Sequence, residues 1–198
     1  AVAAAEVDAN AIERLVKTAP LANVKLQRIV IVNGKLHSKP DGVDVSNDAP
    51  DITHVDPVLE LNSKLKANTY CLSFNGNVDH PLEVLHISTG QGAAITSRLH
   101  IVVSSGASAT VVETFVGEGE YLNNPVTTIE VADGARLDRV KIETEAPSAQ
   151  HLSHVVVSLA ANALFNDFTL TAGAVLNRQN ANIDFNGENV KANVSGSY

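Results

Sequence analysis

The fold is decided by four short segments that recur between Leu99 and Tyr198: Ser105-Gly106-Ala107-Ser108-Ala109, Asp133-Gly134-Ala135-Arg136-Leu137, Ala161-Asn162-Ala163-Leu164-Phe165 and Glu188-Asn189-Val190-Lys191-Ala192. If Gly106, Gly134, Asn162 and Asn189 are equivalent, the intervals between them are 28, 28 and 27 residues. Apolar, mostly β-branched residues precede and follow these turns. A fixed period of this size is typical of stacked repeats, whose strands bury one another.

The second and third segments share a change of phase, because the apolar positions shift by one residue partway along each strand. These positions are Ala135, Leu137, Val140 and Ile142 in the second segment and Ala163, Phe165, Phe168 and Leu170 in the third. Such a shift reverses the faces of a strand unless the chain bends there. We therefore expect both pairs to face inward around a corner of a parallel β-helix, with Gly or Asn in the left-handed turns. The alternative is a β-sandwich whose hairpins have equal length by chance.

Composition limits the possible functions. The chain has 198 residues, 44% hydrophobic and 4% aromatic content and no Trp, so a core of Val, Ile, Leu and Ala is expected, as in a narrow solenoid. The net charge is −8, and Lys and Arg are scattered, which argues against nucleic-acid binding. The sequence contains no apolar run near 20 residues, so no membrane span is predicted.

The single cysteine, Cys71, excludes a disulfide framework within the chain and favours a reducing, cytoplasmic location. The sequence also lacks Met, even at position 1. We therefore expect a piece cut from a longer protein, and an exported origin stays open as an alternative.

Residues 1–68 are predicted to form an N-terminal α/β appendage, and residues 69–198 an incomplete β-helix core. The appendage begins with a helix over 8–18, for which Asp8 is the N-cap, and a hairpin whose turn is Asn33-Gly34. A second helix is expected to start at Asp56-Pro57 and to plug an open end of the solenoid.

An acidic linker over residues 38–57 separates the hairpin from the second helix. Its carboxylates are Asp41, Asp44, Asp48, Asp51 and Asp56. They lack the alternating spacing of a calcium loop, so a solvated connection is expected.

The individual chemical candidates are weak. In the strand from Leu82 to Ser88, His86 shares a face with Leu82 and Val84, and we expect it to be a structural histidine. His151 and His154 are three residues apart on a strand, so they should lie on opposite faces rather than bind one metal.

Three further features are treated as structural. Gly90-Gln91-Gly92 is expected to be a turn, because no Lys-Ser or Lys-Thr pair completes a phosphate loop. Cys71 is expected to be a small buried residue. Glu113 and Arg178 lie in β-rich segments and are expected to face solvent or a subunit surface, because burying them unpaired would be costly.

Several segments resemble, in the right order, the SufB/SufD family of the SUF iron–sulfur cluster assembly system. The resemblance covers about residues 25–198. The segments are Arg28-Ile29-Val30-Ile31-Val32-Asn33-Gly34-Lys35-Leu36, Leu59-Glu60-Leu61-Asn62, Pro81-Leu82-Glu83-Val84-Leu85-His86, Gly106-Ala107-Ser108-Ala109-Thr110-Val111-Val112-Glu113, Asn124-Pro125-Val126-Thr127-Thr128-Ile129-Glu130-Val131, Gly134-Ala135-Arg136-Leu137, Gly173 with Leu176-Asn177-Arg178, and Asn186-Gly187-Glu188. The SufD branch is favoured because the Val32-Asn33-Gly34 hairpin resembles its entry segment and no cysteine motif of the SufB kind lies near the start.

The resemblance implies an all-β, right-handed parallel β-helix and a non-catalytic scaffold subunit. Such a subunit pairs with a SufB-like paralogue and a SufC-like ATPase. In that family the main heterodimer contact, the cluster-related Cys and His residues and the ATPase-docking segment follow the position of Tyr198. No catalytic, cofactor-binding or metal residue is therefore predicted here, and the complete complex is expected to handle the cluster.

Two expectations complete the sequence-based prediction. A β-helix that stops after Asn193-Val194-Ser195 should expose unpaired strand edges, so self-association of the fragment is expected. Two other functional classes stay open, a polysaccharide-active β-helix enzyme and a secreted structural solenoid. The first is disfavoured because the chain has only eight aromatic residues (three Tyr and five Phe) to serve as sugar platforms.

Overall fold

The fold is taken from a computed structural model, which describes residues 7–48, 52 and 56–198. These residues form two helices and ten strands. The helices are α1 (Ala9–Thr18) and α2 (Pro57–Lys64). The strands are β1 (Gln27–Val32), β2 (Lys35–Ser38), β3 (Asn68–Phe74), β4 (Leu82–Val103), β5 (Ser108–Val131), β6 (Arg136–Thr144), β7 (Gln150–Leu159), β8 (Leu164–Thr171), β9 (Leu176–Phe185) and β10 (Lys191–Ser197).

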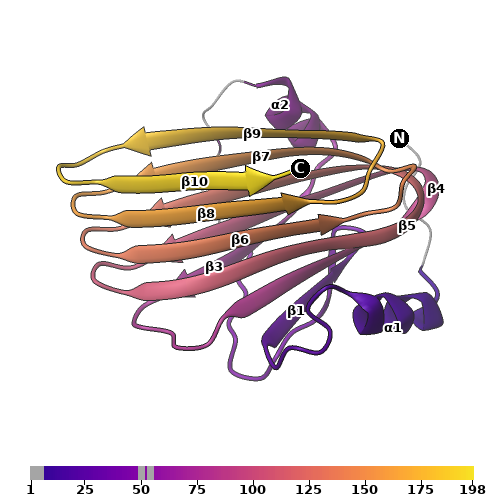
Figure 1. The fold of residues 1–198 in the computed structure, drawn as a ribbon, viewed down its shortest axis with the longest axis horizontal. Coiled ribbons are helices and arrows are strands. Elements are labelled where there is room, and N and C mark those ends of the chain that lie inside the picture. Colours follow the sequence, from indigo (N-terminus) through magenta and orange to yellow (C-terminus); the bar gives the residue numbers. More distant parts are fainter. Residues whose placement is uncertain (1–6, 49–51, 53–55) are drawn as a thin grey trace.

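The strands stack in two parallel columns that wind into a β-solenoid of about five turns (Figure 1). One column contains β1, β4, β5, β6, β8 and β10, and the other contains β3, β4, β5, β7 and β9. The long strands β4 and β5 belong to both columns because each passes around a corner of the solenoid. The register shifts between Gln91 and Ala93, so the predicted turn at Gly90-Gln91-Gly92 is a bulge within β4. The predicted β-helix is thus confirmed.

The four repeated turns form a ladder along one side of the solenoid, as the sequence predicts. Backbone φ angles are +71° at Gly106, +64° at Gly134, +57° at Asn162 and +58° at Asn189. The amides of Gly106, Gly134 and Asn162 each donate to a carbonyl of the next turn, at 3.0, 2.9 and 2.8 Å. The Asn189 side-chain amide also donates to the Asn162 side-chain oxygen at 3.3 Å. Gly and Asn occupy these positions because they tolerate left-handed backbone geometry.

The predicted corner within the second and third repeats is wrong. β6 pairs with β8 in one register from Arg136↔Leu164 to Glu143↔Thr171, so both strands run straight. Their buried face continues from Leu137 to Arg139 and Lys141. The apolar residues after the supposed shift lie on the outer face: Val140 and Ile142 are half-buried, and Phe168 and Leu170 are 41% and 37% exposed.

The apolar interior occupies the half of the solenoid nearest the repeated turns. It contains Val111, Leu137, Val157 and Phe165, each from a different strand and each 1% exposed or less. Ile29 of β1 belongs to the same cluster, because β1 pairs in parallel with β4. The solenoid sheet therefore begins within the region that was assigned to the N-terminal appendage.

The predicted helix α1 and the hairpin are confirmed. Asp8 caps α1 by accepting from the amide of Asn10 at 3.2 Å, and Ile12 packs on the outer face of the sheet against Leu85 and Val116. The hairpin turn at Asn33 joins β1 to β2. A small outer apolar cluster thus forms beneath α1.

The second helix also begins as predicted, with Asp56 as N-cap, but it does not plug an end of the solenoid. α2 lies along the outside of β5 and β7 (Figure 1). The side-chain amide of buried Asn62 donates to the carbonyls of Ser97 and Asn124, at 3.2 and 2.7 Å, which fixes the helix across two turns. Neither α2 nor α1, the two helices among the described residues, is long and apolar enough to cross a membrane.

Replacing Gly134 by Ala should lower the free energy of unfolding by about 1 to 2 kcal/mol, because an alanine is strained at a φ of +64°. A Cβ at this position would have no atom within 4 Å, so the loss reports backbone strain alone. Urea denaturation measures it. The matched control is Gly76→Ala, where the site is equally open and φ is not positive. Equal effects of the two substitutions would contradict the proposed role of the turn column.

Candidate functional site

The half of the interior that lies away from the repeated turns is charged. Inward positions of β5, β6 and β8 carry ionisable side chains that are 4% exposed or less. They are Glu113, Arg139, Lys141, Glu143 and Asp167. Glu145 and His151 adjoin this group from the corner after β6 and from β7. Burying so many charges is tolerated only if they are paired and hydrogen-bonded.

Arg139 links the charges of three successive turns. Its Nε donates to Glu113 of β5 at 2.6 Å and its Nη1 donates to Asp167 of β8 at 2.7 Å. The hydroxyl of Thr127, farther along β5 and beyond its corner, donates to Glu113 at 2.8 Å. Burial acts to raise the pKa of Glu113, but the guanidinium and these hydrogen bonds lower that pKa overall. Glu113 therefore stays ionised beside the guanidinium, which also contacts Asp167.

Lys141 is the centre of a second group of polar side chains. Its ammonium lies 3.1 Å from Glu143 Oε2 and 2.9 Å from His151 Nε2. It also donates to Ser153 Oγ at 2.9 Å and to Gln179 Oε1 at 3.0 Å. Burial lowers the pKa of Lys141, although Glu143 acts in the opposite direction.

His151 connects Lys141 to the corner of the solenoid. Its Nδ1 lies 2.5 Å from Glu145 Oε2, and the other oxygen of Glu145 accepts from Asn123 at 2.9 Å. Burial lowers the pKa of His151 well below its usual value and raises the pKa of Glu145. The hydroxyl of Tyr121 is buried beside Glu145, and burial and this carboxylate raise the pKa of the phenol; no hydrogen bond of good geometry joins the hydroxyl to a described residue.

His86 lies in an earlier turn and joins the group through an aromatic stack. Its ring stacks on Phe115 with centroids 4.4 Å apart, and Phe115 meets His151 edge-on at 5.0 Å. Burial lowers the pKa of His86 to about 4, so the ring is neutral near pH 7. The expectation of a structural histidine agrees with this buried environment, although Nε2 of His86 has no hydrogen-bond partner among the described residues.

The acid and imidazole groups around Lys141 have the chemistry of metal ligands. Glu143, Glu145 and His151 can each offer one ligand atom, and these atoms lie within 4.8 Å of one another. A cavity of about 10 Å³ adjoins Arg139 and Lys141, which is room for about one water molecule. The geometry thus suits charge pairing or a small cation rather than an organic substrate.

The structure separates the two histidines that the sequence analysis considered together. His151 faces the interior, whereas His154 lies on the outer face beneath α2, with Nδ1 3.4 Å from Asp56 and Nε2 2.6 Å from the side-chain oxygen of Asn182. Cys71 is a buried free thiol, as expected. The acidic linker contributes nothing to the site among its described residues, since Asp41, Asp44 and Asp48 are exposed. Asp51 lies outside the described residues.

The expectation for Glu113 is wrong, while that for Arg178 is confirmed. Glu113 faces the interior at 1% exposure because Arg139, 26 residues later, supplies its counter-charge. Arg178 is exposed, and its Nε donates to Asn180 at 3.3 Å.

Sequence reasoning missed most of the charged interior. It assigned apolar Val140 and Ile142 to the inside, so Arg139 and Lys141 were placed outside by default. One signal could have corrected this: Leu137 and Arg139 are two residues apart and therefore share a face in a straight strand.

Residues 86–198 match the family described as "SUF system FeS cluster assembly, SufBD core domain". The chain is 36% identical over 116 residues to the "Iron-sulfur cluster assembly protein SufD" of Escherichia coli (strain K12), covering 55% of this chain and 27% of that protein. It is 31% identical over 118 residues to an "Iron-sulfur cluster assembly SufBD family protein" of Mycobacterium leprae (strain TN), covering 60% of this chain and 30% of that protein. The matches thus span less than a third of these relatives.

Replacing Arg139 by Met should lower the free energy of unfolding by about 3 to 5 kcal/mol, because Glu113 and Asp167 would be left buried without a counter-charge. The loss should shrink at acidic pH as these carboxyl groups take up protons. Denaturant unfolding at two pH values measures both effects. Arg136→Met is the control, since Arg136 pairs with Asp138 at the surface. A loss no larger than that of the control would contradict the network.

Replacing His86 by Gln should flatten the dependence of stability on pH between about 6.5 and 4. The folded protein keeps this ring neutral down to a pKa of about 4, whereas the unfolded chain takes up the proton near pH 6.5. Stability is therefore lost as pH falls through this window, by on the order of 3 kcal/mol from this residue. Urea unfolding at pH 7 and pH 4.5 tests the difference, with exposed His37→Gln as the control. Identical pH profiles for wild type and His86→Gln would refute the assignment.

Proposed function

Because the chain belongs to the SufBD core family of the SUF system of FeS cluster assembly, we propose that it is part of a non-catalytic, SufD-like scaffold subunit that helps assemble iron–sulfur clusters. The observation that carries the proposal is the family match over residues 86–198. This range holds most of the solenoid, from within β4 to β10.

The arrangement of the charged side chains supports a scaffold role. A catalytic acid or base must reach its substrate within hydrogen-bonding distance. Here Glu113, Arg139, Lys141 and His151 are enclosed by neighbouring turns and pair with one another. Their geometry suits stabilisation of the solenoid more than turnover of a substrate.

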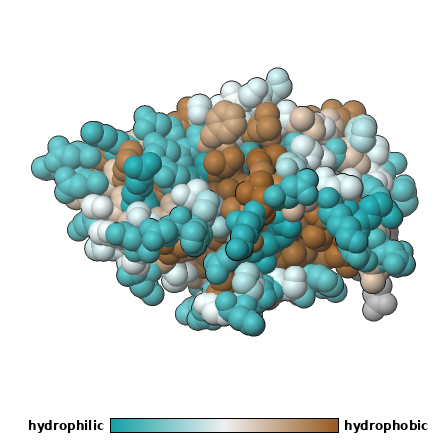
Figure 2. Space-filling view, turned by 60° about the horizontal axis from the view of Figure 1, so that its bottom comes forward, coloured by the Kyte–Doolittle hydropathy of each residue, from teal (hydrophilic) through white to brown (hydrophobic). Residues whose placement is uncertain are grey.

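We further propose that the complete gene product works in a complex with a SufB-like paralogue and a SufC-like ATPase, in the cytoplasm. A long, straight stack of strands gives such a subunit a rigid frame with extended outer faces. One of these faces carries exposed Phe168 and Leu170. Figure 2 shows hydrophobic residues bordered by hydrophilic ones on the lower side of the molecule as drawn in Figure 1. The free thiol Cys71 suits a reducing compartment.

Affinity purification from co-expressing cells tests the proposed complex. The complete gene product, with a tag, should retain the SufB-like and SufC-like proteins of its own genome in stoichiometric amounts. The 198-residue chain is run in parallel and should not retain the ATPase, since the family resemblance assigns the docking segment to another part of the protein.

Two outcomes would contradict these proposals. If the complete product retains neither protein, the scaffold role is wrong. If the 198-residue chain retains the ATPase as well as the complete product does, the docking surface lies within residues 1–198.

A further inference from the structure

We propose that Glu143, Glu145 and His151 bind one divalent transition-metal ion inside the solenoid, beneath the corner that joins β6 to β7. This inference is independent of the proposed complex, because it rests only on side chains of this chain. Two carboxylates and one imidazole are a mixed oxygen and nitrogen set, which suits ions such as Mn²⁺, Fe²⁺ or Zn²⁺.

The positions of the three side chains meet the first requirement of a metal site. Their ligand atoms lie within 4.8 Å of one another, so modest side-chain rotations can bring them around one ion. Glu143 and His151 are fully buried and Glu145 is 4% exposed. Glu145 precedes Ala146 and exposed Pro147 at the corner, so the site lies close beneath the surface.

The charge of the interior meets the second requirement. Four buried carboxylates, Glu113, Glu143, Glu145 and Asp167, face two buried cations, Arg139 and Lys141. Buried acidic side chains thus outnumber buried basic ones by 4 − 2 = 2 in this part of the interior. A divalent cation can balance such an excess, and buried acidic groups without a counter-charge are costly.

Two buried polar atoms at the site are incompletely satisfied by the rest of the described chain. Oε2 of Glu143 has an ion-pair contact with Lys141 Nζ at 3.1 Å, but no hydrogen bond of good geometry. The hydroxyl of Tyr121, which is 2% exposed, lies beside Glu145, also without a hydrogen bond of good geometry. A network built only for internal pairing would satisfy such atoms, because buried polar groups are almost always bonded. Their presence points to a group that the side chains alone do not supply.

Lys141 is the competitor for the site. Its ammonium lies among the ligands, 3.1 Å from Glu143 Oε2 and 2.9 Å from His151 Nε2. It also bonds Ser153 and Gln179, so it can keep two partners when an ion takes its place beside the ligands. Removing the positive charge at position 141 should therefore strengthen metal binding.

Zn²⁺ titration of the chelator-treated 198-residue chain tests the proposal, by calorimetry and by equilibrium dialysis near pH 7.5. We expect one equivalent per chain. Glu145→Gln and His151→Asn should each weaken binding by at least about tenfold, which is the usual scale for disturbing a metal site. Exposed Glu120→Gln and His80→Asn are the matched controls and should bind as the wild type does.

A Lys141→Met variant gives an independent readout. Zn²⁺ should bind this variant at least about tenfold more tightly than it binds the wild type. Zn²⁺ should therefore also raise the midpoint of thermal unfolding of the variant more than that of the wild type. Co²⁺, titrated into wild type and variants, should show visible bands that disappear in Glu145→Gln. Circular dichroism establishes whether each variant is folded. If His151→Asn does not fold, the test rests on Glu145→Gln.

Three results would overturn the proposal. The first is a folded wild-type chain that binds no stoichiometric Zn²⁺. The second is a Zn²⁺ affinity that is as little changed by Glu145→Gln and His151→Asn as by the control substitutions. That result would place the ion at the surface. The third is binding by Lys141→Met alone, which would show that the ammonium keeps the native site closed to metals.

Discussion

The structure depends on one constraint, which is that every inward side chain is stacked between side chains of the neighbouring turns, about one strand spacing away. A charge that faces inward can therefore find a partner in the neighbouring turn, about one repeat away in the sequence. Arg139 does so with Glu113, 26 residues before it, and with Asp167, 28 residues after it. The repeat length that stacks the turns of the solenoid thus also places the counter-charges of Arg139 beside it.

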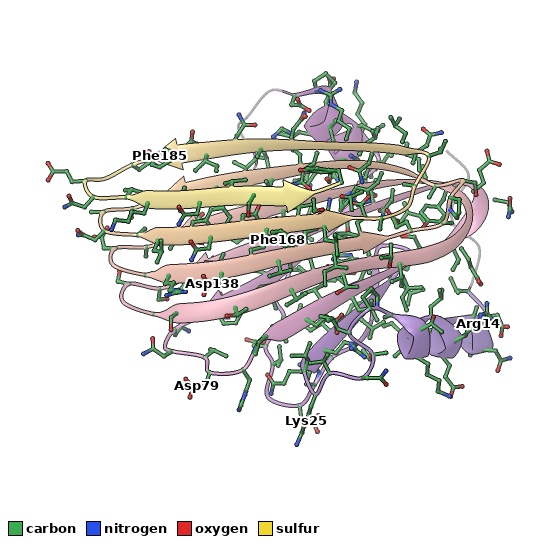
Figure 3. All side chains as sticks on the ribbon, viewed as in Figure 1. Arg14, Lys25, Asp79, Asp138, Phe168 and Phe185 are labelled. Atoms are coloured by element: carbon green, nitrogen blue, oxygen red, sulfur yellow. The ribbon has the colours of Figure 1, made fainter. Side chains whose placement is uncertain are left out.

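Features encoded by short-range chemistry could be predicted from the sequence. The left-handed Gly and Asn turns, the Asp8 and Asp56 caps and the Asn33-Gly34 hairpin each follow from local geometry. The faces of β6 and β8 could not be assigned in this way. A strand that alternates charged and apolar residues has two distinguishable faces, but the alternation does not tell which face is inside. Because Phe168 is apolar, sequence analysis assigns it to the interior, whereas it lies on the outer face. Figure 3 shows Phe168 on β8 and Asp138 on the neighbouring strand β6, and Phe168 is 41% exposed.

The site and the position of α2 depend on contacts that are distant in the sequence. Asn62 holds α2 through the carbonyls of Ser97 and Asn124, 35 and 62 residues away, and a helix pattern does not predict which surface will supply such acceptors. The cluster around Lys141 likewise combines residues of β6, β7 and β9 with the corner after β6. Each of these polar residues, considered alone in the sequence, is compatible with a position on the protein surface. Only the register of the paired strands brings them together into one cluster.

The charged interior also determines which register is possible. An apolar solenoid tolerates a slip of two residues between neighbouring strands, since the faces are preserved and one apolar residue replaces another. In this solenoid a two-residue slip between β6 and β8 would move Asp167 from Arg139 to Leu137 or to Lys141, and would leave Arg139 opposite Thr169 or Phe165. A buried charge without its partner costs several kcal/mol, which is far more than a change of apolar neighbours. The interior charges therefore contribute less to overall stability than an apolar core would, but they penalise the two-residue slips between β6 and β8 that an apolar interior would tolerate.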